Sequence, residues 1–253
     1  MQSSNPALSE NVFRNFESYG DHTVMTLSGT ATKTIIAIGI TMAAAAFAWA
    51  QLSNGGPVIG YLAGGGIVGF IIAIATMFKP SWAPITTPLY AIAEGCFLGA
   101  VSLLTQNMLL ARNVLQPGQN IAIQACAVTF GVLAVMMILY QTGTIRVTNK
   151  LRFGIVAAGG AIFLVYLINI IMSFFGAGIG FIHNSGPLGI AFSVLAAGVA
   201  AFFLLLDFDQ IDRLAASRAP KYMEWYGAFT LLMTLVWLYL EILRLLSKLQ
   251  SRD

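Results

Sequence analysis

The segment FFLLLDFDQIDR, residues 202–213, joins an apolar run to three acids, Asp207, Asp209 and Asp212. A second segment, LYLEIL at residues 238–243, places Glu241 inside the last apolar run of the chain. A carboxylate at the centre of a membrane-spanning helix costs about 2.5–3.5 kcal/mol on insertion scales, so it usually has a partner or a function. The two segments therefore predict membrane-spanning helices and mark these acids as functional candidates.

The composition extends this prediction to the whole chain. Of the 253 residues, 58% are hydrophobic and 9% are charged, whereas soluble domains carry about 25% charged residues. The net charge of +3 is small and spread over loops, which argues against a basic patch for nucleic acid. We therefore expect an all-α polytopic membrane protein that has the lipid bilayer as its surroundings and no nucleic-acid partner.

Seven apolar runs each approach the ~20 residues that one membrane span requires. They are Thr34–Gln51, Pro57–Phe78, Thr87–Leu104, Asn120–Tyr140, Phe153–Phe175, Pro187–Leu206 and Tyr226–Leu246. Because irregular backbone cannot face lipid, each run is expected to be a helix. The predicted organisation is a polar N-terminal tail at residues 1–33, without a signal-peptide pattern, and a seven-helix transmembrane domain at residues 34–253.

The basic residues of the short loops predict the orientation of the chain. The loop after the fourth run carries Arg146, Lys150 and Arg152, and the loop after the sixth carries Arg213, Arg218 and Lys221. Because cytoplasmic loops are enriched in Lys and Arg, the amino terminus is expected in the cytoplasm. Seven spans then place the basic C-terminal tail outside. Either the earlier loops outweigh that tail, or the seventh run does not cross fully.

The sequence lacks the residues that several kinds of membrane-protein chemistry require. The lysines lie at run ends or in loops, which excludes a mid-membrane Schiff base, and both histidines lie outside the runs. No phosphate-binding loop or Gly-x-Ser-Gly motif is present. The two cysteines, Cys96 and Cys126, are isolated inside runs and suggest neither a zinc site nor a disulfide framework. We therefore expect no enzymatic activity and no cofactor.

Asp207 directly follows the sixth run, at the expected cytoplasmic mouth of the bundle, and is the stronger functional candidate there. Asp209 and Arg213 are four residues apart on one helix, a spacing that favours an ion pair. Asp209 and Asp212 are therefore accessory candidates, interpreted first as interface charges that are solvated or paired with neighbouring basic side chains. Glu241 shares a helical face with apolar residues and is expected to turn inward, with Arg244 as an alternative partner.

Glu94 is a further acid inside an apolar run, the third. It is either a protonated group that is hydrogen-bonded to a neighbouring helix or a lining group of an ion path. Two carboxylates close together in a low-dielectric site raise each other's proton affinity. Such a pair binds a hard cation such as calcium when it is ionised.

At LDFDQI (residues 206–211) and LYLE (residues 238–241), the chain resembles the Bax inhibitor-1 family, also called the transmembrane Bax inhibitor motif family, including its bacterial YccA-like members. Gly95, Leu98 and Gly99 are similar to its glycine-leucine-glycine element. The resemblance implies seven helices with the last at the centre, in a bacterial inner membrane. It also implies a pH-sensitive calcium leak that is controlled by one acid from the sixth helix and one from the seventh. Asp207 matches the first acid, and Glu241 stands where the second is usually Asp.

The sequence leaves open both the pairing of Asp207 with Glu241 and the choice between two functions. If the last helix begins near Tyr226, Glu241 lies about 22 Å along it, so a direct pair with Asp207 requires the helix to begin earlier. The alternative function is a non-conducting regulator that binds a membrane protease or another membrane protein through its spans and its polar tail. Calcium passage through pure protein in liposomes would discriminate the two functions.

Overall fold

The computed structural model describes residues 24–116, 118–176 and 185–251. Within these residues, seven helices are long and apolar enough to cross a membrane. They are α2 (Leu27–Ser53), α3 (Val58–Phe78), α4 (Ala83–Ala111), α5 (Ile121–Gln141), α6 (Asn149–Phe174), α8 (Pro187–Ala216) and α9 (Met223–Gln250), with a short 3-10 helix, η2 (Pro80–Trp82), before α4. The predicted all-α polytopic membrane architecture is confirmed.

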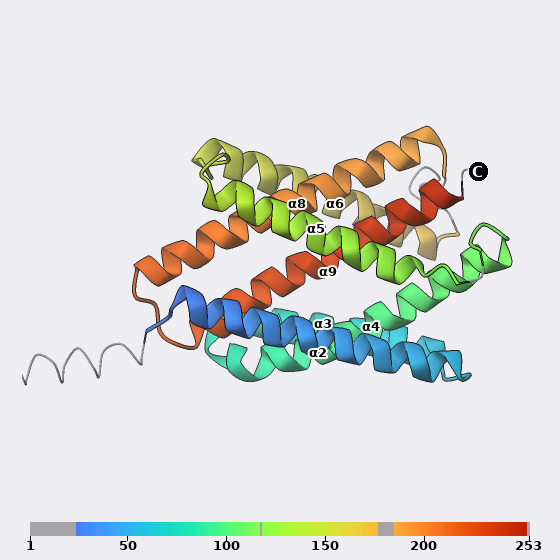
Figure 1. The fold of residues 1–253 in the computed structure, drawn as a ribbon, viewed down its shortest axis with the longest axis horizontal. Coiled ribbons are helices and arrows are strands. Elements are labelled where there is room, and N and C mark those ends of the chain that lie inside the picture. The colour runs from blue at the N-terminus through green and yellow to red at the C-terminus, as the bar shows by residue number, and fades with distance from the viewer. Residues whose placement is uncertain (1–23, 117, 177–184, 252–253) are drawn as a thin grey trace, which may run out of the picture.

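The last helix lies at the centre of the bundle. In Figure 1, α9 runs obliquely between one group formed by α2, α3 and α4 and a second formed by α5, α6 and α8. It packs against α2, α4, α5 and α8, while α3 packs mainly on α4 and α6 mainly on α8. In the most apolar window of each helix, 61% of α9 is buried, compared with 17% of α3 and of α6. The predicted central position of the last helix is confirmed.

The helices extend beyond the apolar runs that predicted them. The sixth run ends at Leu206, yet α8 continues to Ala216 and carries all three acids of its segment. Likewise α4 runs from Ala83 to Ala111 rather than from Thr87 to Leu104. Hydropathy marks the part of a helix that lies in lipid, whereas backbone hydrogen bonding continues through polar residues into the interface.

The chain before α2 is fixed to the turn between α8 and α9. The backbone N–H of Met25 donates to the carbonyl of Ala219 at 2.7 Å, and Val24 forms a β-bridge with Pro220. The Thr26 side chain caps α2 by accepting from the N–H of Gly29. The first helix therefore begins at Leu27, within the segment that the sequence analysis assigned to the N-terminal tail; residues 1–23 of that tail lie outside the described residues.

Glycines bring α2 and α4 into close contact. A Cβ atom at Gly95 would lie 2.4 Å from the carbonyl oxygen of Thr41, and one at Gly99 would lie 2.4 Å from that of Ala45. Only a residue without a side chain fits such a backbone approach. The four-residue spacing of these two glycines thus serves packing within one bundle.

Candidate functional site

Ionisable side chains occupy three levels along α9. We call the end of the bundle where α2 begins and α8 meets α9 the first end, and the opposite end the far end (Figure 1). Glu224 lies at the first end, Thr234 faces Asp207 at an intermediate level, and Glu241 lies closer to the far end.

Asp207 is buried in the bundle, and none of the described ion pairs includes it. It is 9% exposed, and its side chain makes a polar contact with Thr234 of α9. Its Oδ2 atom is buried and has no hydrogen-bond partner among the described residues. A buried polar atom without a partner costs about 1–3 kcal/mol, and more when it is charged. This oxygen is therefore a site at which a proton, a water molecule or a cation is stabilising.

Glu241, by contrast, has all the partners that a buried carboxylate needs. It is 1% exposed, and the Tyr166 hydroxyl of α6 lies 2.9 Å from both of its oxygens. The Trp237 indole N–H donates to it at 3.2 Å. Arg244 donates to the two oxygens at 3.1 and 2.9 Å and lies over the Tyr166 ring. The alternative interpretation, in which Arg244 is the partner of Glu241, matches this geometry.

The structure does not bring Asp207 and Glu241 together as a hydrogen-bonded pair. Helix α9 begins at Met223, earlier than the expected Tyr226, yet the residue that it presents to Asp207 is Thr234. Glu241 lies about two turns, or ~10 Å, further along the helix. In place of the expected site with two acids, one acid, Asp207, faces the hydroxyl of Thr234. The physical reason is the register of the antiparallel α8–α9 hairpin.

The accessory acids Asp209 and Asp212 have polar partners on neighbouring helices at the first end. Asp209 accepts from Arg213 at 2.8 Å and also pairs with Arg152 of α6. Asp212 accepts a hydrogen bond from the Tyr140 hydroxyl of α5. These contacts join α5, α6 and α8 and agree with the interpretation of both acids as interface charges.

Glu94 lies at the contact between α3 and α4. It is half-buried, and a Cβ atom placed on Gly69 of α3 would be 2.8 Å from its Oε1 atom. The side chain thus faces α3, and no described hydrogen bond or ion pair links it to Asp207 or Glu241. The structure separates Glu94 from the acids of the α8–α9 hairpin.

Glu224 is a buried acid that the sequence analysis missed. It is 0% exposed and accepts from the backbone N–H and the hydroxyl of Thr26, both at 2.9 Å. Lys221 pairs with it at 2.9 Å, and Lys33 of α2 is a second cationic partner. Gly29 makes room for the carboxylate, since a Cβ atom there would lie 2.3 Å from Oε1. The pattern that could have indicated a paired acid here is the three-residue spacing of Lys221 and Glu224 before the last apolar run.

Lys248 shows that the basic C-terminal segment continues α9. It is 5% exposed, and its ammonium group donates to the carbonyl of Gly189 at 2.9 Å and to the Ser193 hydroxyl at 2.8 Å. Both acceptors belong to the first turns of α8. The 28 residues of α9 correspond to about 42 Å of helix, which is long enough to cross a bilayer completely.

The described residues contain no group of three or more His, Cys, Asp or Glu side chains that could hold a metal ion. Calcium usually takes six to eight oxygen ligands. Asp207 and Thr234 supply only part of such a set, so any calcium at this level would retain water molecules or gain ligands through a change of conformation.

The central, mostly buried helix and its buried acids define a polytopic membrane protein with ionisable groups in its core. The family model described as Bax inhibitor 1 like matches residues 5–251, so the chain belongs to that family. This match confirms the family resemblance that the sequence motifs indicated. No curated protein and no solved structure was found to match the chain.

Proposed function

We propose that the protein is a pH-sensitive calcium leak in which Asp207 is the carboxylate that calcium ions and protons share. The observation that carries the proposal is the buried Asp207 Oδ2 atom, which has no partner among the described residues. An ionised carboxylate binds a hard cation, and its protonated form does not.

The proposal assigns this role to Asp207 rather than to a pair with Glu241. Arg244 already compensates the charge of Glu241, whereas none of the described ion pairs includes Asp207. Removing a carboxylate from water without a counter-charge is unfavourable. A proton or a passing cation at Asp207 would relieve that cost.

Passage of an ion through this level requires a change in packing. The described core around the hairpin is apolar and includes Leu204, Leu205, Leu231 and Leu235. Asp207 lines neither of the two described cavities. We propose that α8 moves relative to α9 to open a path, and that the protonation state of Asp207 biases this movement.

The proposal also places the first end in the cytoplasm of a bacterial inner membrane. Supporting it, most of the described basic residues lie at the first end: Lys33, Lys79, Arg146, Lys150, Arg152, Arg213, Arg218 and Lys221. Far fewer, Arg112, Arg244 and Lys248, lie toward the far end. By the positive-inside rule, this distribution supports an amino terminus in the cytoplasm. In this account the protein conducts ions and catalyses no reaction.

The direct test is calcium entry into liposomes that contain the purified protein and an internal calcium indicator. We expect faster entry than into protein-free liposomes, and slower entry at acidic pH because protons compete for the same oxygens. Entry equal to that of protein-free liposomes at every pH would overturn the proposal. That result would favour the alternative, a non-conducting regulator of a membrane protease or another membrane protein.

A further inference from the structure

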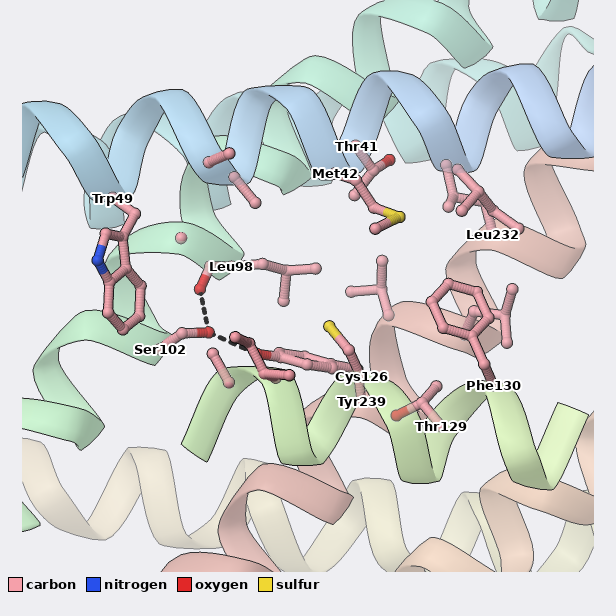
Figure 2. Close-up of a pocket in the computed structure, with 18 of the residues that line it drawn as sticks. Thr41, Met42, Trp49, Leu98, Ser102, Cys126, Thr129, Phe130, Leu232 and Tyr239 are labelled. Atoms are coloured by element: carbon pink, nitrogen blue, oxygen red, sulfur yellow. Dashed lines mark hydrogen bonds between the residues drawn. The ribbon is translucent and has the colours of Figure 1, made fainter. Parts of the chain in front are cut away.

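A cavity of about 470 Å³ lies between α2 and α5, with α4 and α9 behind it (Figure 2). Its size falls within the range of pockets that hold small ligands. Its lining is mostly apolar and includes Met42 and Trp49 of α2, Cys126 and Phe130 of α5, and Leu235 and Tyr239 of α9. None of the acids discussed above lines it, so it does not include the Asp207 site.

The rim of the cavity continues the lipid-facing surface of the bundle. Met42, Ile123 and Phe130 line the cavity and are 51%, 67% and 37% exposed. They lie on two membrane-spanning helices, so their exposed surface contacts hydrocarbon. Helices α2 and α5 belong to different groups on either side of α9 (Figure 1), and these exposed lining residues leave the cavity open on its outer side, which faces hydrocarbon when the helices span a bilayer.

The floor of the cavity has its polar atoms already paired. The Ser102 hydroxyl and the Tyr239 hydroxyl are 2.7 Å apart, and Ser102 also donates to the carbonyl of Leu98 at 2.6 Å. Figure 2 shows this pair at one side of the apolar lining. With both hydroxyls paired, this part of the lining offers little to hold an ordered water molecule. The floor is therefore suited to hydrocarbon rather than to a headgroup or an ion.

We propose that the cavity between α2 and α5 is a binding site for one acyl chain of a bilayer lipid. The chain enters sideways between Met42 and Phe130 and packs on Leu235 and Tyr239 of the central helix. Leu235 directly follows Thr234, the residue that faces Asp207. Successive residues of a helix are about 100° apart, so the acyl chain contacts a different face of α9 from the one that meets Asp207.

The test uses the whole protein in bilayers that contain a phosphatidylcholine with a photoactivatable diazirine in its acyl chain. Leu235 and Tyr239 are 6% and 8% exposed, so labelling of α9 at these residues requires a chain inside the cavity. Peptide mass spectrometry after illumination locates the label. We expect labelled α9 peptides in addition to labelled peptides from the outer helix faces.

A matched pair of variants separates the cavity from the general lipid-facing surface. Ala46 and Ala43 are both exposed on α2, and only Ala46 lines the cavity. Ala46→Phe fills the cavity and should abolish labelling of α9. Ala43→Phe places the same side chain outside it and should leave that labelling unchanged. Unlabelled α9 in the unmodified protein, or equal labelling in both variants, would overturn the proposal.

A second measurement distinguishes hydrocarbon from water in the cavity. A spin label on Cys126, in a protein with Cys96→Ala, reports collisions with oxygen, which dissolves in lipid, and with a water-soluble nickel complex. We expect frequent collisions with oxygen and few with nickel. Frequent nickel collisions would show a water-filled vestibule and would also contradict the proposal. Neither measurement depends on whether the protein conducts calcium.

Discussion

The Tyr166 hydroxyl of α6 lies 2.9 Å from both carboxylate oxygens of Glu241 on α9. With Arg244, which donates to the same carboxylate, this contact connects a peripheral helix to the central one. Arg244 of the same helix compensates the charge of Glu241. The contact between Glu241 and the Tyr166 hydroxyl holds α6 and α9 together. Asp207, by contrast, is a buried acid of the α8–α9 hairpin that takes part in none of the described ion pairs.

The first prediction concerns this network. Tyr166→Phe removes the hydroxyl and keeps the ring, so the unfolding free energy in detergent should fall by about 0.6–1.7 kcal/mol, the range of hydrogen bonds between membrane helices. Glu241→Gln should cost more, because Arg244 loses its counter-charge. The double variant should cost less than the sum of the two, since both changes break one network. Additive costs would show that the two side chains act independently.

The second prediction concerns Glu224. Glu224→Gln leaves Lys33 without its buried partner, and breaking a buried ion pair costs about 3–5 kcal/mol. Asp209→Asn is the control, because its partners Arg152 and Arg213 are 39% and 57% exposed and such pairs contribute about 0–1 kcal/mol. Thermal unfolding of both variants in detergent measures the difference. A Glu224→Gln protein as stable as the control would contradict the account of the first end.

The third prediction concerns the contact between α2 and α4. Gly95→Ala would bring a methyl group against the Thr41 carbonyl and force the helices apart, at about 1–3 kcal/mol. Gly64→Ala is the matched control, since nothing lies within 4 Å of a Cβ atom there. The denaturation midpoints of the two variants should therefore differ, with Gly95→Ala the lower. Equal midpoints would mean that α2 and α4 pack more loosely than described.

The fourth prediction concerns topology. Asn54 follows the far end of α2, and Lys150 lies in the first turn of α6 at the first end. Single cysteines at these positions, in a protein without Cys96 and Cys126, should react with an impermeant thiol reagent from opposite sides of the membrane. The Lys150 position is expected to face the cytoplasm. Reaction of both from one side would exclude the proposed arrangement.

The apolar runs predicted all seven helices because hydrocarbon thickness fixes the length of a span. They missed the helix ends, such as residues 207–216 of α8, because polar residues continue a helix beyond the lipid. The partner of Asp207 was not predictable in the same way. It depends on the register between α8 and α9, which the conformation of the intervening turn sets.

Glu224 shows a second limit of sequence reasoning. Its partners Thr26 and Lys33 are 198 and 191 residues away along the chain, and no local pattern reports such contacts. Glu241 was predicted to face inward because its helical neighbours are apolar, and this is where it lies. The identity of its main partner on another helix, Tyr166, again required the three-dimensional packing.

The central claim is that Asp207 is the group at which protons and calcium compete. It is tested by calcium entry into liposomes with the Asp207→Asn protein, from mildly acidic to mildly alkaline pH, beside the Asp209→Asn control. Asparagine keeps the shape of the side chain and cannot ionise, so we expect slower calcium entry that no longer changes with pH. The control should retain both the rate and the pH dependence of the unmodified protein. An Asp207→Asn protein whose calcium entry still slows at acidic pH would contradict the account.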